Sequence, residues 1–276
     1  MAGPKYRIFI VPERSDKALI DTRSLAVKEI LLSPPNLRPD CFGFRGLSKI
    51  RLTPEGIEGV GITAEQELTL MKNGYLELRC PLRSALFQWY KEEAGVPDVN
   101  WLYPYAVLEM PLSILKVAKA LYEIANIRAN IRLGQEYRNV ADFALPYGHP
   151  RSPFFGRKLK AFEGQHIVSR EIVLNSDYEP RRVARVLVEE VYTHFGYKEN
   201  EVPQLEDAVD RELQDGGRRY WYDVLGRSGW SVNYVKEVDK KEKIVRFYQE
   251  IYDQNGQLVE VHQKYPEDTG HQLVEK

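Results

Sequence analysis

Histidine and carboxylate residues gather near the C-terminal end of the chain, in a pattern that could bind a metal ion. Glu260 and His262 lie two residues apart in a strand-like run, so their side chains point to the same face. Asp268 and His271 follow in a loop that could return them to that face. Imidazole and carboxylate ligands together suit zinc, manganese or iron. One hypothesis is therefore a metal-dependent hydrolase or nuclease in which Glu260 acts as the base. The alternative is a polar sheet face with a hydrogen-bonded exit loop.

Basic and aromatic residues alternate a little earlier in the chain, over residues 218–230. The members of this candidate nucleic-acid interface are Arg218, Arg219, Trp221, Arg227 and Trp230. Guanidinium groups engage phosphates and aromatic rings stack on bases, so the pattern suits a single-stranded nucleic acid. The alternative is a strand whose rings pack on the rest of the protein while its arginines reach solvent. Several glutamates nearby would oppose phosphate.

A third candidate site is a group of arginines at the start of a predicted helix. Arg181, Arg182 and Arg185 fall in its first turns, where the helix macrodipole disfavours positive charge. That cost suggests an anion-binding site for an acidic partner or ligand. The alternative is an ordinary solvated helix face.

Recognised catalytic motifs are absent from the sequence. It contains no Gly-x-Ser-x-Gly, no P-loop, no His-Glu-x-x-His and no dinucleotide fingerprint. Ser113 and Lys116 match Ser-x-x-Lys, but they lie in an apolar helix, and the motifs that accompany Ser-x-x-Lys in catalytic sites are missing. Cys41 and Cys80, the two cysteines, cannot form a structural zinc site alone. We therefore predict no cofactor and no catalytic residue.

Composition narrows the class of protein. Hydrophobic residues make up 43% and charged residues 29% of the 276 residues, which is ordinary for a folded protein. The net charge of −1 gives no overall attraction to nucleic acid or to an anionic membrane. No apolar run is long enough to span a membrane, and the N-terminus does not resemble a signal peptide. These features predict a cytoplasmic protein without membrane contact.

Hydrophobic periodicity predicts an α+β (mixed α/β) fold: a largely antiparallel sheet packed by two main helices. Apolar alternation and turn residues indicate strands over 6–11, 43–52, 57–62, 67–71, 75–80, 128–133 and 166–174. A short helix is predicted over 23–32, and the first main helix over 110–124, with Pro111 in its first turn. The second main helix follows a capping box in which Ser176 is the N-cap and Glu179 its partner.

The C-terminal region predicts an antiparallel β-meander with strands over 230–238, 244–252 and 258–265. Asn255-Gly256 is a strong signal for a two-residue hairpin turn, because both residues tolerate positive φ. A two-residue turn at this position predicts four pairs between the strands that it connects: Ile251 with Glu260, Gln249 with His262, Glu250 with Val261 and Tyr252 with Val259. The predicted organisation is a main domain over 1–200, a linker over 201–217 and a meander over 218–276.

Several short motifs in the first two thirds of the chain resemble a known family. They are Asn73-Gly74-Tyr75-Leu76-Glu77, Leu102-Tyr103-Pro104-Tyr105, Glu136-Tyr137-Arg138-Asn139, Leu145-Pro146-Tyr147 and the helix before Phe195-Gly196. Over about residues 30–200 the chain resembles the C-terminal companion region of bacterial Schlafen-AlbA-type DNA-binding or ATP-binding proteins. The nucleic-acid-binding domain that names that family has no counterpart here. The resemblance therefore implies a bacterial companion module.

The leading prediction is a non-catalytic interaction or accessory module that docks a partner protein in a larger complex. A near-neutral chain rich in tyrosine and tryptophan, with no catalytic motif, matches the composition of protein interfaces. Nucleic-acid binding through residues 218–230 and metal-dependent hydrolysis through the C-terminal histidines are the alternatives.

Overall fold

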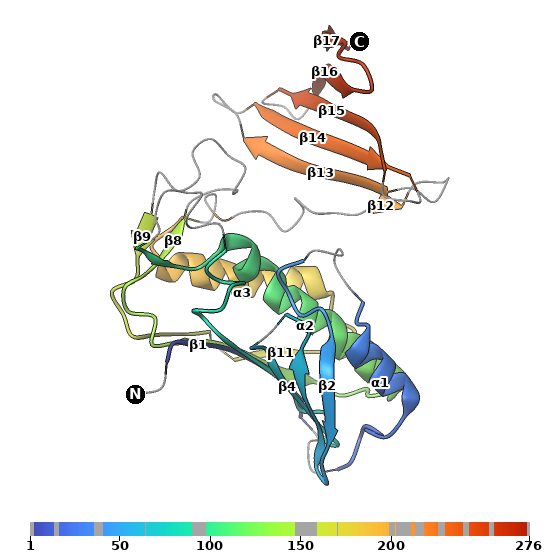
Figure 1. Cartoon of the computed structure of the whole chain (residues 1–276), viewed down its shortest axis with the longest axis vertical. Coiled ribbons are helices and arrows are strands. Elements are labelled where there is room, and N and C mark those ends of the chain that lie inside the picture. The colour runs from blue at the N-terminus through green and yellow to red at the C-terminus, as the bar shows by residue number, and fades with distance from the viewer. Residues whose placement is uncertain are drawn as a thin grey trace. The chain divides into compact units, whose positions relative to one another are not determined.

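The chain divides into two compact units, Met1–Pro203 and Gln204–Lys276 (Figure 1). The computed structural model describes residues 3–13, 17–35, 41–63, 65–89, 98–146, 159–169, 171–198, 202, 211–212, 218–225, 230–239, 243–253 and 257–274.

An eight-stranded antiparallel sheet forms the centre of the first unit. Its strands are β1 (Lys5–Pro12), β2 (Leu47–Leu52), β3 (Gly56–Gly61), β4 (Glu67–Met71), β5 (Leu76–Pro81), β7 (Ile131–Arg138), β10 (His166–Val168) and β11 (Ile172–Leu174). They pair in the order β10-β7-β1-β5-β4-β3-β2, and β11 also pairs with β7. The hairpin between β4 and β5 turns at Asn73-Gly74, where Gly74 has a φ of +86°. The N-terminal strand β1 is thus central, with β5 on one side and β7 on the other.

Within the described residues, three helices accompany this sheet: α1 (Leu25–Leu32), α2 (Pro104–Ile124) and α3 (Pro180–His194). Figure 1 shows α2 and α3 on one face of the sheet. Strand β1 alternates accordingly, because Tyr6, Ile8 and Ile10 are fully buried while the residues between them are not. The α+β class with a largely antiparallel sheet, predicted from the sequence, is confirmed.

Helix α2 begins earlier than the sequence predicts. It starts at Pro104, which occupies the first turn, so that Pro111 lies inside the helix. A proline within a helix removes one backbone hydrogen bond and usually kinks or ends it. Here nearly every residue from Pro104 to Leu115 is buried, and burial of this apolar segment outweighs the lost bond. The prediction of a start at Met110 was therefore wrong.

The loop before β2 is fixed to α2 by two hydrogen bonds. The amide of Phe42 donates to the Glu109 carboxylate at 2.6 Å, and the amide of Phe44 donates to Ser113 Oγ at 2.7 Å. Ser113 in turn donates to the carbonyl of Met110. The buried serine thus connects this loop to the backbone of α2.

The N-terminus of α3 also differs from the prediction. Glu179 is the N-cap, and its side chain accepts hydrogen bonds from the amides of Arg181 at 3.0 Å and Arg182 at 2.6 Å. Pro180 occupies the first helical position, which suits its fixed φ and its missing amide hydrogen. Because the helix begins at Pro180, Ser176 lies too far upstream to cap it.

A small sheet completes the first unit: β6 (Asn100–Trp101), β8 (Phe143–Pro146) and β9 (Leu159–Ala161). Strand β6 pairs in parallel with β8, and β9 pairs antiparallel with it. None of the described helices is long and apolar enough to cross a membrane.

The second unit contains a six-stranded antiparallel meander. Its strands, paired in chain order, are β12 (Arg211–Glu212), β13 (Arg218–Leu225), β14 (Ser231–Val238), β15 (Ile244–Tyr252), β16 (Leu258–Tyr265) and β17 (Gly270–Leu273). The predicted meander is present, and β12 lies within the stretch predicted as a linker.

The register between β15 and β16 matches the prediction at three of its four pairs. Gln249 pairs with His262, Glu250 with Val261 and Ile251 with Glu260. The fourth pair was wrong, because a register shift next to Ile251 places Tyr252 opposite Leu258. Such an irregularity inserts an extra residue into one strand, which alternation alone does not reveal. The predicted turn at Asn255-Gly256 lies outside the described residues.

Candidate functional site

The face of the eight-stranded sheet opposite α2 and α3 carries a continuous set of charged side chains. Side chains of a strand alternate between faces. On β1 the fully buried residues Tyr6 and Ile8 therefore leave Lys5, Arg7 and Phe9 on the other face. We call this surface the open face, since many of its side chains are exposed.

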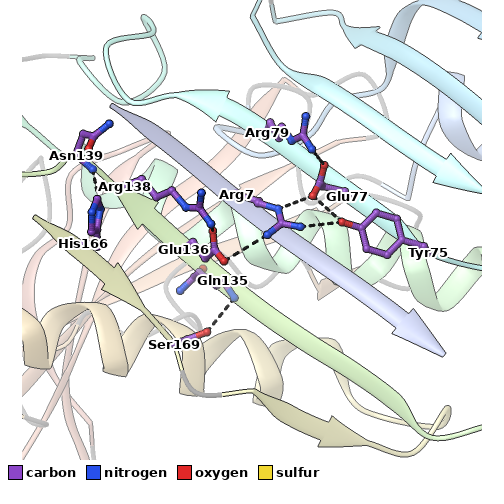
Figure 2. A network of polar contacts seen from close by, with 10 residues as sticks. All are labelled: Arg7, Tyr75, Glu77, Arg79, Gln135, Glu136, Arg138, Asn139, His166 and Ser169. Carbon is purple, nitrogen blue, oxygen red and sulfur yellow. Dashed lines mark hydrogen bonds and ion pairs between the residues drawn. The ribbon is translucent and has the colours of Figure 1, made fainter. Parts of the chain in front are cut away.

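Five residues from β5, β1 and β7 form an ordered chain of ion pairs across the open face, here called the arginine–glutamate row. Its members, in spatial order, are Arg79, Glu77, Arg7, Glu136 and Arg138. Figure 2 shows positive and negative groups alternating along it.

Each contact of the row joins a guanidinium nitrogen to a carboxylate oxygen. Arg79 Nη2 lies 2.5 Å from Glu77 Oε1, and Arg7 Nε contacts the other oxygen of the same carboxylate. Arg7 Nη1 lies 3.3 Å from Glu136 Oε1, and Arg138 Nη2 lies 2.7 Å from Glu136 Oε2. The central Arg7 therefore bridges the two carboxylates, while each outer arginine contacts one of them.

Burial differs along the row in a regular way. The Glu77 and Glu136 side chains are only 3% and 12% exposed, and Arg7 is 29% exposed. The outer arginines, Arg79 and Arg138, are 52% and 58% exposed. The row thus presents two positive ends to solvent and keeps its negative groups covered.

Two aromatic rings support the centre of the row. The Arg7 guanidinium lies 4.7 Å from the centroid of the Phe9 ring, which stacks on Tyr75 at 6.4 Å. The Tyr75 hydroxyl accepts a hydrogen bond from Arg7 at 2.9 Å and donates one to Glu77 at 2.6 Å. Burial raises the pKa of the Tyr75 phenol, and the hydrogen bond to Glu77 raises this pKa further. Tyr75 therefore keeps its proton and acts as a donor.

Gly134 on β7 makes room for the Phe9 ring. A Cβ atom at this position would lie 2.5 Å from Phe9 Cζ, well inside van der Waals contact. The absence of a side chain at Gly134 lets the ring lie flat against β7 beside Arg7.

Gln135 locks β7 to its neighbours on the buried side of the sheet. Its side chain accepts from Tyr6 Oη at 3.2 Å and donates to the Leu187 carbonyl in α3 at 3.2 Å. Its backbone amide donates to Ser169 Oγ at 2.9 Å, a contact also visible in Figure 2. Because these bonds fix β7, they also fix where Glu136 and Arg138 stand on the open face.

The arrangement supports binding more directly than proton transfer. Both carboxylates of the row contact two arginines each, so their oxygens are already engaged within the protein. No hydroxyl or thiol nucleophile is among the five residues. Among the described residues, no group of three or more histidine, cysteine, aspartate or glutamate side chains is placed to hold a metal ion.

The four predicted metal ligands do come together in the second unit, although in pairs. His262 Nε2 lies 2.8 Å from Asp268 Oδ1, and His271 Nδ1 contacts Glu260. The two imidazole rings lie 4.4 Å apart. Each of these nitrogens faces a carboxylate instead of a shared centre, so the described geometry forms two imidazole–carboxylate contacts rather than a metal site.

The predicted nucleic-acid interface is partly engaged within the protein. Arg219 lies 2.7 Å from Glu250 and 3.8 Å from Glu237, and its guanidinium stands over the Tyr248 ring. Trp230 is exposed. For Arg218 and Trp221 the structure describes only their place in β13, and Arg227 lies outside the described residues.

The arginines predicted to bind an anion lie at the start of α3, where one side chain and two backbone amides already contact carboxylates of the protein. Arg185 Nε lies 2.7 Å from the Glu189 carboxylate, one turn later. The amides of Arg181 and Arg182 donate to the Glu179 carboxylate. A built-in anion therefore already occupies the helix end that was predicted to attract one.

The arginine–glutamate row was not predicted from the sequence, yet the sequence carries a signal for it. The pattern Glu-x-Arg occurs at Glu77 and Arg79 and again at Glu136 and Arg138. Residues two apart share a face of a strand, so each pattern places an acid and a base side by side. What the sequence does not show is that β1 lies between these two strands.

Comparison with known proteins adds no relative. No family model, no curated protein and no solved structure matches this chain. The resemblance to the companion region of Schlafen-AlbA-type proteins therefore stays a prediction.

Proposed function

We propose that the protein is a non-catalytic interaction module that docks a partner protein on the open face of its eight-stranded sheet. The observation that carries the proposal is the arginine–glutamate row, with its covered carboxylates and its two exposed arginine ends. In this proposal Arg79 and Arg138 contact the partner, while Glu77 and Glu136 hold the arginines in place.

Preorganisation favours such a role. Binding normally costs about 0.5–1.5 kcal/mol for each flexible side chain that becomes fixed at an interface. Arg7 is already held by Glu77, Glu136 and Tyr75 before any partner arrives. Arginine and tyrosine are also the residues enriched at the energetic centres of protein interfaces.

Charge reversal at the two ends of the row tests the proposal. Arg79→Glu combined with Arg138→Glu should abolish co-purification of the partner when tagged protein is isolated from its native host. The matched control is Arg185→Glu, because Arg185 is exposed and ion-paired on helix α3, which lies on the other face of the sheet. Circular dichroism should show that all variants are folded. If the double variant and the wild type retrieve the same partner in equal amounts, the open face is not the docking surface. A wild type that retrieves no partner would contradict the proposal itself.

A further inference from the structure

Positive charges stand directly opposite each other on the open face. In the register of the sheet, Arg7 on β1 pairs with Arg79 on β5, and Lys5 on β1 pairs with Arg138 on β7. Like charges at directly opposed positions of an antiparallel sheet are destabilising. Two such pairs next to each other lower the stability of the sheet, although the fold does not require positive charges at these positions.

The carboxylates nearby do not balance this charge. Lys5, Arg7, Arg79 and Arg138 supply four positive charges, and the two glutamates of the row supply two negative ones. Glu67 on β4, opposite Arg79, supplies a third negative charge, so one positive charge remains in excess. The chain as a whole has a net charge of −1, so this patch has the opposite sign.

The outer arginines have donors to spare for a ligand. A guanidinium group carries five N–H donors and binds a carboxylate best through two of them. Among the residues that the structure describes, Arg79 forms an ion pair only with Glu77 and Arg138 only with Glu136, each through Nη2. Both side chains are more than half exposed, so the remaining donors can reach an incoming carboxylate.

From these observations we infer that the docking partner presents an extended acidic segment, with separated carboxylates that bind Arg79 and Arg138. The inference rests on the proposed function and specifies the chemistry of the partner. The two arginines lie two strands apart and are offset by two residues, a separation of roughly 12 Å by standard strand spacings. Acidic residues about four positions apart in an extended chain span that separation.

Separated carboxylates fit this patch better than a polyanion such as nucleic acid. The carboxylates of Glu77 and Glu136 lie between the arginines, where a chain with a charge on every nucleotide would place phosphates against them. The rings of Phe9 and Tyr75 stack on each other, and Arg7 covers Phe9. The Phe9 ring and one face of Tyr75 are therefore already engaged, which leaves less ring surface for stacking on bases.

Fluorescence anisotropy with the whole protein tests the inference. The probes are a labelled Gly/Ser peptide with glutamates four positions apart, the same peptide with glutamine in their place, and a labelled oligothymidine of equal net charge. We expect the glutamate peptide to bind at low salt and to weaken as salt rises. Arg79→Gln combined with Arg138→Gln should lower its affinity at least about tenfold, a difference of about 1.4 kcal/mol. Arg185→Gln on helix α3, away from the open face, should leave it unchanged.

Three outcomes would overturn the inference. They are no binding of the glutamate peptide, equal binding of the glutamine peptide, and tighter binding of oligothymidine. Competition separates this inference from the proposed function. The open face could capture a partner protein that excess glutamate peptide does not displace. In that case the proposed docking function stands, and the inference that the partner presents an acidic segment is wrong.

Discussion

Replacing the most buried carboxylate of the row should destabilise the first unit measurably. Glu77 is 3% exposed and contacts Arg7, Arg79 and Tyr75. In Glu77→Gln the shape is kept but the negative charge is lost, so the positive charge of Arg7 loses its main partner. Removing one member of a fully buried pair costs about 3–5 kcal/mol. Because Arg7 and Arg79 are partly solvated, we expect a smaller loss of about 2 kcal/mol in the free energy of unfolding.

Glu58→Gln is the matched control. Glu58 also pairs with an arginine on the open face, but the Arg51 and Glu58 side chains are 76% and 45% exposed. Exposed pairs of this kind contribute about 0–1 kcal/mol. Burial, rather than the chemistry of the substitution, therefore distinguishes the two variants.

Urea unfolding followed by circular dichroism at pH 7 measures both effects. With a slope of about 2 kcal/mol per molar urea, the midpoint of Glu77→Gln should fall by about 1 M. The midpoint of Glu58→Gln should move by less than half of that. Hydrogen exchange of the β1, β5 and β7 amides should locate the loss in these strands. Equal midpoints for the two variants would refute the reasoning that the row is a buried, preorganised unit.

Three further predictions concern the elements around the row. Gly43→Ala would place a Cβ atom 2.5 Å from Ser113 Oγ and should cost about 3 kcal/mol, or about 10 °C in Tm by calorimetry, whereas Gly3→Ala, with nothing within 4 Å, should be neutral. Burial raises the pKa of the Cys80 thiol to about 11, so this cysteine should react with a thiol reagent at pH 8 only after unfolding. The stability that the protonated thiol contributes is complete below the unfolded pKa of about 8.5 and is lost as the pH rises through 11. A native thiol that reacts within minutes, measured against Cys80→Ser, would contradict the predicted protection of Cys80. Glu179→Ala removes the cap of α3 and should lower Tm by about 2–4 °C, an effect that Glu179→Ser should largely restore.

Sequence alone predicts the parts of this fold that depend on neighbours in the chain. The hairpin at Asn73-Gly74 and most of the pairing between β15 and β16 follow from turn residues and alternation, because each hairpin fixes its own register. The start of α2 was missed for the opposite reason. Local preference places Pro111 in the first turn of a helix. Burial of the residues around it overrides that preference, so the helix begins at Pro104.

The candidate site depends on pairings between distant segments, and so it was missed. Two Glu-x-Arg patterns are visible in the sequence, but nothing local indicates that Arg7 lies between them. The C-terminal histidines and acids were predicted to lie together and do so, because Glu260, His262 and His271 occupy adjacent hairpin strands and Asp268 lies in the connection between them. Which imidazole contacts which carboxylate depends on side-chain orientations that the spacing of the residues in the sequence does not determine.

The central position of the N-terminal strand has a consequence for the order of events during synthesis. Strand β1 leaves the ribosome before both of its partner strands, because Arg7 pairs with a residue 70 positions later and Tyr6 bonds one 129 positions later. At about 5–20 residues per second, the second partner strand follows after roughly 6–26 s. During that interval Tyr6, Ile8 and Ile10, which are fully buried in the finished sheet, have no β7 to pack beside. We therefore expect the nascent N-terminal segment to need protection by a chaperone, whereas each hairpin of the C-terminal meander can close as soon as it emerges.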